Sequence, residues 1–165
     1  MSTQAMSAIW SKLALVAATV SAVVVVVVVG FGQPSSLCVE VEHAIDPLSS
    51  LHVDPGTSVI YTTDPPTSGP HLDNENLSGL MGGPQDELEI VTALEGGEVV
   101  IEFDRTSENP ARLIELADDA VVLVPVERDG VQARAWGRLL TCPTVDVEAV
   151  SEFARTNRLR SRAHE

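Results

Sequence analysis

Residues Tyr61–His71, with the sequence YTTDPPTSGPH, are the segment of this 165-residue chain whose residue types best suit specific chemistry. An imidazole is a common metal ligand and a good polar anchor for a bound molecule, so His71 is the candidate functional residue of the segment. A lone histidine can equally hydrogen-bond a neighbouring carbonyl group and lock its loop onto a domain. The residue types alone leave both roles open.

The same segment, which we call the proline loop, is predicted to be stiff. Proline fixes its own φ angle near about −65° and lacks a backbone donor, and the residue before it favours an extended conformation. The only soft point is Ser68-Gly69. The sequence therefore predicts a rigid loop that loses little conformational entropy on binding. Its structural residues are Pro65, Pro66, Ser68, Gly69, Pro70 and His71.

Three segments together carry a resemblance to a known family: the proline loop, LEGGEVVIEF at Leu94–Phe103, and ARAWGRLLTC at Ala133–Cys142, with the strand motif Ala135-Trp136-Gly137. They resemble the domain of unknown function 3105 family over about Leu51 to Phe153. Members of that family are mostly bacterial proteins with a membrane-anchored domain outside the cytoplasm. Their activity is not established, so the resemblance implies a location rather than a reaction.

Members of the family usually carry further histidines in a segment similar to VHSLEHG. Here the segment reads VTALEGG, so Thr92 and Gly96 stand where histidines are usual. His52 and His71 match the family pattern, and Glu95 stands in a matching position. These three N/O ligands could hold copper or zinc. Because two family histidines are replaced, the resemblance implies a depleted metal site.

The sequence contains no motif for phosphate binding or for nucleophilic catalysis. It has no glycine-rich phosphate loop, no GxSxG motif and no Cys–His pair with nucleophile spacing, so we expect no catalytic residues. Residues 1–30 hold one Lys and no acidic residue; the rest holds nine Arg and 24 Asp or Glu, a formal net charge of 9 − 24 = −15. Such an acidic protein repels phosphate backbones, which excludes nucleic-acid binding.

The amino-terminal region predicts a single-pass anchor. Leu13 to Phe31 is an uncharged run that includes seven consecutive valines, and it is long enough to cross a bilayer as a helix. Lys12 precedes the run, which places the N-terminus in the cytoplasm and the rest of the chain outside the cell membrane. A cleaved signal peptide is the alternative, although its apolar core is usually shorter.

This interpretation gives a five-part organisation. The expected parts are a cytoplasmic N-terminus at 1–12, a transmembrane anchor at 13–31, a linker at 32–50, a soluble extracytoplasmic domain at 51–160 and a tail at 161–165. Cys38 and Cys142 would both lie outside the cytoplasm, where disulfides persist, so we expect them to be bonded. The alternatives are two unrelated thiols or pairing with another protein.

The soluble domain is predicted to be α+β, with a small, mostly antiparallel sheet and two helices. The expected strands are Ser58–Thr62, Leu88–Ala93 paired with Glu98–Phe103, a central strand Ala120–Val126, and Val131–Leu140 after a hairpin turn at Arg128-Asp129-Gly130. The expected helices are Ala111–Ala117, capped by Asn109, and Val147–Arg158, capped by Asp146. Trp136 is expected to pack under the last helix or against the proline loop.

Two functions fit these features. The first is a membrane-anchored, extracytoplasmic, non-catalytic binding or assembly module with a possible protein partner. The second is a copper- or zinc-binding protein, or a small metalloenzyme, that uses His52, His71 and Glu95. A third, weaker hypothesis is that the acidic face supports a larger membrane complex. The oligomeric state does not follow from the sequence.

Overall fold

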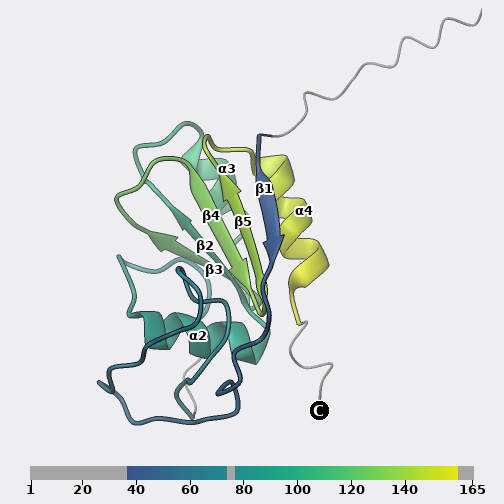
Figure 1. Ribbon diagram of the computed structural model, residues 1–165. Helices are drawn as coiled ribbons and strands as arrows, with labels where there is room; N and C mark the ends of the chain where they lie inside the picture. Colours follow the sequence, from purple (N-terminus) through teal and green to yellow (C-terminus); the bar gives the residue numbers. More distant parts are fainter. Residues whose placement is uncertain (1–36, 74–76, 160–165) are drawn as a thin grey trace, which may run out of the picture. The chain divides into compact units, whose positions relative to one another are not determined.

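The structure is a computed structural model that describes residues 37–73 and 77–159 (Figure 1). Within these two ranges no helix combines the length and the apolar character that a membrane crossing requires. The predicted anchor at 13–31 and the tail at 161–165 lie outside the described residues.

A five-stranded mixed sheet in the order β1-β5-β4-β2-β3 is the centre of the domain (Figure 1). Its strands are β1 (Val39–Glu42), β2 (Val99–Phe103), β3 (Val121–Pro125), β4 (Val131–Ala135) and β5 (Arg138–Cys142). Three neighbouring pairs run antiparallel, and only β2 and β3 are parallel. The expected mostly antiparallel sheet is therefore confirmed, with one parallel pair added.

Three helices accompany the sheet: α2 (Glu87–Gly96), α3 (Pro110–Ile114) and α4 (Val147–Asn157). Two helices were expected, and α2 replaces the predicted strand Leu88–Ala93. That prediction was wrong because a short apolar run does not separate a buried strand from a buried helix. The start of α2 is fixed by a capping box between Asp86 and Glu89, and Gly97, with φ of 94°, caps its C-terminal end. These caps are local signals that favour a helix.

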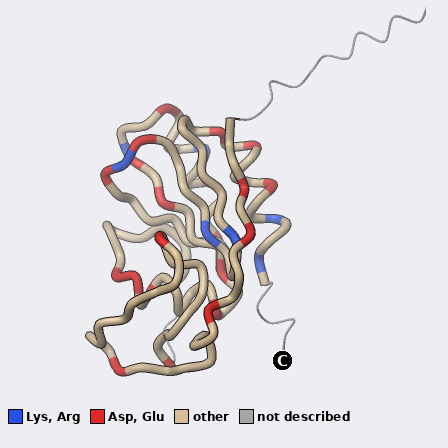
Figure 2. Tube along the Cα trace, in the orientation of Figure 1, with Lys and Arg blue, Asp and Glu red and all other residues tan. Residues whose placement is uncertain are grey.

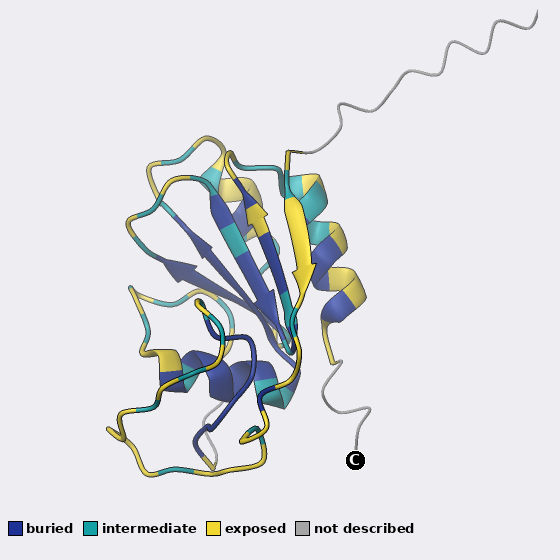
Figure 3. Ribbon diagram, viewed as in Figure 1, coloured by how far each residue is buried: buried dark blue, intermediate teal, exposed yellow. Residues whose placement is uncertain are grey.

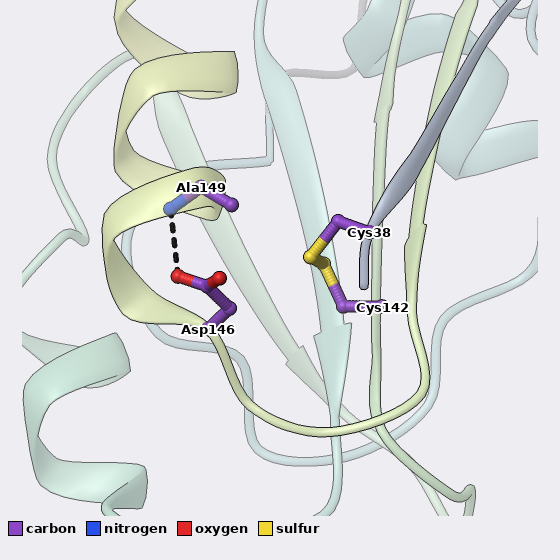
Figure 4. Close-up of a disulfide and its surroundings, with 4 residues drawn as sticks. All are labelled: Cys38, Cys142, Asp146 and Ala149. Atoms are coloured by element: carbon purple, nitrogen blue, oxygen red, sulfur yellow. Dashed lines mark hydrogen bonds between the residues drawn. A yellow bond between two sulfur atoms is a disulfide. The ribbon is translucent and has the colours of Figure 1, made fainter. Parts of the chain in front are cut away.

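The sequence predicted N-terminal caps for two helices, and the structure has only one of them. The Asp146 carboxylate accepts a hydrogen bond from the Ala149 amide, 3.0 Å away, so α4 begins as expected (Figure 4). Asn109 precedes Pro110 at the start of α3, but its side chain makes no capping hydrogen bond. The shorter α3 ends at Ile114, three residues before the predicted end.

The predicted strand Val131–Leu140 is two strands. A tight turn at Trp136-Gly137, where Gly137 has φ of 68°, separates β4 from β5 and pairs them as a hairpin. The turn also reverses the side-chain alternation, so Leu140 joins the face that Val131, Ala133 and Ala135 occupy, and Leu139 does not.

Two further strand predictions are wrong. Ser58–Thr62 contains no strand, and β3 is the last strand of the sheet order rather than a central one. The Asp129-Gly130 turn links β3 to β4, but these strands are not neighbours because β2 lies between them, so it is not a hairpin turn. The continuous apolar run of β3 is explained by burial on both faces of the sheet.

Each face of the sheet supports its own apolar cluster (Figure 3). On one face, Leu113 of α3 and Val150, Phe153 and Ala154 of α4 pack against alternate residues of β2 to β5. On the opposite face, Ile90, Ala93 and Leu94 of α2 pack against Val100, Val122 and Val124. The proline loop lies on this second face, so α2 and the sheet together position it.

The expected disulfide is present. Cys38 and Cys142 are bonded, with a sequence separation of 104 and Cα atoms 4.1 Å apart (Figure 4). The bond lies next to the first β1–β5 pair, Val39 opposite Thr141. The segment 32–50, predicted as a linker, thus contains β1, which is a strand of the sheet.

Candidate functional site

The proline loop is built into the domain. Every residue from Pro66 to Leu72 is buried, while the preceding residues from Thr57 to Pro65 are partly or fully exposed. The Asp64–Pro65 peptide bond is cis. Burial of the loop is unusual because loops normally lie at the surface, where water satisfies their backbone groups. Its polar groups must therefore find partners within the protein.

These partners come from four separate parts of the chain. The Thr67 carbonyl oxygen accepts from the Gly137 amide at 2.9 Å, and the Ser68 hydroxyl accepts from the Asp46 amide at 2.9 Å. The Leu72 amide donates to the Thr92 hydroxyl of α2 at 2.9 Å. The His71 amide donates to the Leu51 carbonyl oxygen at 3.1 Å. The loop is thereby attached to the β4–β5 turn, to α2 and to the preceding segment.

Gly69 allows the loop to pass close to Tyr61. Its φ is 143°, and a Cβ atom at this position would lie 2.7 Å from Cδ1 of Tyr61. The Tyr61 hydroxyl in turn donates to the Pro70 carbonyl oxygen at 3.2 Å. Burial of the phenol, followed by the nearby negative charges of Glu87 and Asp86, raises the pKa of Tyr61 to about 12. The tyrosine is therefore neutral in the folded protein at all ordinary pH values.

His71 is buried, and its ring has a defined orientation. Nδ1 lies 3.1 Å from the Gly69 carbonyl oxygen, which can only accept, so Nδ1 carries a proton and donates. The other ring nitrogen, Nε2, lies 3.9 Å from Oε2 of Glu95, which is beyond hydrogen-bond distance. His71 thus performs the carbonyl-binding role that the sequence left open, and its Nε2 faces α2.

His52 lies beside His71. The two residues form an isolated parallel bridge, and their ring centroids are 4.8 Å apart in an edge-to-face arrangement. Nδ1 of His52 lies 3.9 Å from Oδ1 of Asp73, and both side chains are exposed. The three predicted metal ligands therefore meet as two pairs, His52 with His71 and His71 with Glu95.

These pairs do not form a metal cluster in the structure. Among residues 37–73 and 77–159, no group of three or more His, Cys, Asp or Glu side chains is arranged to hold a metal ion. Of the two positions where the resemblance places histidine, Thr92 lies directly under the loop, because its hydroxyl contacts the Leu72 amide and the Leu88 carbonyl oxygen. A hydroxyl that connects the loop to α2 thus stands where the resemblance places a histidine. The metal site stays a prediction.

Trp136 lies at the same end of the sheet. It packs against the apolar cluster around α2, and its ring is edge-on to His71 with centroids 6.2 Å apart. Of the two positions expected for this residue, the structure has the one against the proline loop. Its neighbour Ala135 is the last residue of β4, and Gly137, in the turn that follows, donates its amide hydrogen to the loop at Thr67.

Sequence reasoning missed Arg134, whose side chain is fully buried beneath the loop. Nη1 donates to Oε2 of Glu87 at 2.6 Å and to the Pro66 carbonyl oxygen at 3.4 Å. Nη2 lies 3.1 Å from Oε2 of Glu102, as an ion pair without hydrogen-bond geometry. One guanidinium group therefore joins β4, β2, α2 and the proline loop. The signal in the sequence was the charged Arg134 between two alanines of an alternating strand, which indicates a polar contact on the second face of the sheet.

The comparison against protein families gives a match. A model described as "Protein of unknown function (DUF3105)" matches residues 52–165, which is more than half of the chain. The chain belongs to this family. The match to the domain of unknown function 3105 family includes the proline loop, α2 and the Trp136 turn. Comparison with curated proteins and with solved structures gives no match.

Proposed function

We propose that this member of the domain of unknown function 3105 family is a membrane-anchored, extracytoplasmic and non-catalytic binding or assembly module, and that the buried proline loop is the rigid support of its recognition surface. The observation that carries the proposal is the set of bonds from Thr67–Leu72 to four parts of the domain. A surface that is already fixed loses little conformational entropy when a partner docks, which favours binding.

The candidate recognition surface consists of the exposed groups around buried His71. His52 and Asp73 have side-chain exposures of 56% and 80%, and Glu95 has 45%. Two carboxylates beside an imidazole offer hydrogen-bond acceptors and negative charge. Such a surface suits a partner that presents amino, guanidinium or amide groups.

Anchoring and location rest on two supports. The uncharged segment 13–31 has the length of a membrane-spanning helix, with Lys12 on its N-terminal side. The Cys38–Cys142 disulfide is compatible with an oxidising compartment outside the cytoplasm. Neither support depends on the identity of the partner.

A copper- or zinc-binding protein is the second candidate, because one feature of His71 favours it. Metal-ligating histidines usually donate their other ring N–H to a carbonyl or carboxylate group, which fixes the ring. His71 has this arrangement through Gly69, and its Nε2 is directed toward Glu95 with His52 alongside. A small shift of the exposed Glu95 and His52 side chains would be needed to complete a site.

Photo-crosslinking in intact cells tests the first candidate. A benzoylphenylalanine probe replaces exposed His52, and a matched probe replaces exposed Glu148 on α4, on the other face of the sheet. The proposal expects one discrete adduct in the membrane fraction with the probe at position 52 and none with the probe at position 148. No adduct at position 52, or the same adduct from both positions, would contradict it.

A further inference from the structure

The two edge strands of the sheet, β3 and β1, differ in whether another segment pairs with their outer side. Beyond β3, the segment around Leu80 closes the edge, since the Met81 amide donates to the Leu123 carbonyl oxygen and the Leu123 amide donates to the Gly79 carbonyl oxygen, both at 2.8 Å. Beyond β1, no backbone hydrogen bond joins the outer edge of Val39–Glu42 to another described residue. An open strand edge presents unpaired backbone donors and acceptors to solvent.

The side chains of β1 alternate between aliphatic and acidic. Val39 and Val41 are 61% and 41% exposed, although valine is a residue that folding normally buries. Glu40 and Glu42 point to the opposite face, since successive side chains of a strand alternate. Both glutamates pair with Arg138 of β5, at 3.2 Å and 2.7 Å. They nevertheless stay 43% and 67% exposed, so they retain negative charge toward solvent.

This edge strand is also held firmly in place. The Cys38–Cys142 disulfide fixes the register of β1 on β5 directly before the first residue of the strand, and the Arg138 ion pairs fix it along the rest. A four-residue strand at the edge of a sheet would otherwise fray. Lysine, proline and bulges, which often protect sheet edges, are absent from Cys38–Glu42. The strand is protected by its short length and by the acidic side chains of Glu40 and Glu42 (Figure 2), and these charges favour a basic partner over an acidic one.

We propose that the outer edge of β1 accepts an added strand from a partner protein, in which basic and aliphatic residues alternate. The backbone of that segment completes the open ladder, its basic side chains face Glu40 and Glu42, and its aliphatic side chains cover Val39 and Val41. A second copy of this chain fits less well, because each chain carries a formal net charge of −14 and two β1 strands would bring like charges together. The inference rests on the proposed binding function but uses a surface separate from His52.

A peptide with the sequence acetyl-Lys-Val-Lys-Val-Lys-Val-amide probes this edge on the full chain in detergent micelles. Calorimetry gives its affinity, and amide hydrogen exchange reports protection along Val39–Glu42. We expect binding with slowed exchange in β1. Substitution of Glu40→Gln together with Glu42→Gln should weaken binding several-fold. The matched control, Glu148→Gln with Glu152→Gln on α4, removes the same charge and should leave binding nearly unchanged.

Three results would overturn the inference. A peptide with proline in place of its central valine could bind equally well, which would mean charge attraction without strand pairing. The α4 substitutions could weaken binding as much as the β1 substitutions. The β1 amides that point away from β5 could be protected in the free chain, which would mean that another part of this chain already covers the edge. The crosslink at position 52 is unaffected by all three, so the proposed function is judged separately.

Discussion

Arg134 of β4 donates a 2.6 Å hydrogen bond to Glu87, the first residue of α2, and the guanidinium group that does so is entirely buried. The same group reaches Glu102 of β2 and the Pro66 carbonyl oxygen. A strand, a helix and the proline loop thus share one positive charge. Any change to that charge should affect all three.

Substitution of Arg134→Met is therefore expected to destabilise the domain strongly. Removal of the Arg134 guanidinium leaves the buried carboxylate of Glu102, in β2, with less positive charge to neutralise it. Breaking a buried ion pair in this way typically costs about 3–5 kcal/mol. Chemical denaturation of the full chain in detergent measures the free energy of unfolding. Arg155→Met is the control, because Arg155 and its partner Glu152 are both exposed. Equal unfolding midpoints for the two variants would contradict the role given to Arg134.

Gly69→Ala tests the close approach of the loop to Tyr61. A Cβ atom would lie 2.7 Å from the tyrosine ring, so either the ring or the loop backbone must move. Overpacking of this kind costs about 1–3 kcal/mol. Gly56→Ala is a matched control, because Gly56 also has a positive φ, of 81°, but a Cβ atom there meets nothing within 4 Å. Thermal unfolding should show a lower midpoint for Gly69→Ala than for the control. Equal midpoints would show that the Tyr61 ring moves aside at no cost in stability.

The raised pKa of Tyr61 predicts a loss of stability in alkali. Its pKa is about 12 in the folded protein against an ordinary tyrosine pKa of 10.0, so between these values the unfolded chain releases the proton more readily. Stability contributed by the neutral phenol is present below pH 10 and falls as the pH rises toward 12. Tyr61 is the only tyrosine in the chain, so phenolate absorbance reports its titration directly.

Tyr61→Phe is the control for that experiment, since it lacks the ionisable group and loses only the bond to Pro70. The free energy of unfolding of this variant should decline less between pH 10 and pH 12 than that of the parent. A phenolate transition near the ordinary tyrosine pKa of 10.0 in the folded protein would mean that the ring is not shielded from water as described.

Loss of the disulfide should weaken the domain and release β1. The bond joins residues 104 positions apart, and on the chain-entropy model a loop of this size corresponds to about 4–5 kcal/mol. We expect Cys38→Ser to lower the free energy of unfolding and to speed amide exchange in Val39–Glu42. The reduced parent should behave in the same way. If exchange in β1 does not change, the Arg138 ion pairs alone hold the strand.

Local signals in the sequence were sufficient where one residue sets the structure. Asp146 caps α4 as expected, and the even number of cysteines in an expected oxidising compartment led to the Cys38–Cys142 bond. The apolar run of β3 correctly indicated a strand. Its position in the sheet did not follow, because a strand at the edge can be as fully buried as a central one when another segment covers it.

The errors arose where periodicity is ambiguous. Leu88–Ala93 is apolar enough for a strand, and only the capping residues Asp86 and Glu89 indicate a helix. Val131–Leu140 alternates across a turn that Trp136-Gly137 makes in two residues, so one strand and a hairpin give nearly the same pattern.

The environment of the site could be predicted only in part. The stiffness of the proline loop was expected, and His71 indeed bonds a carbonyl oxygen. Burial of the loop was not foreseen, because it depends on Arg134, Thr92 and Asp46 from distant parts of the chain. Alternation along β4 shows that Arg134 and Ala133 point to opposite faces of the sheet. It does not show what covers the face that Arg134 occupies.

The central claim is that His71 pins the proline loop of a binding module rather than holding a metal ion. Metal content of the full chain, measured after incubation with copper or zinc and removal of excess ion, tests it most directly. The matched variants are His71→Ala and His43→Ala, since His43 also contacts the loop, through Thr67. Our account predicts no stoichiometric ion in any of the three proteins. About one ion per chain in the parent and in His43→Ala, lost in His71→Ala, would contradict it and establish the metal site.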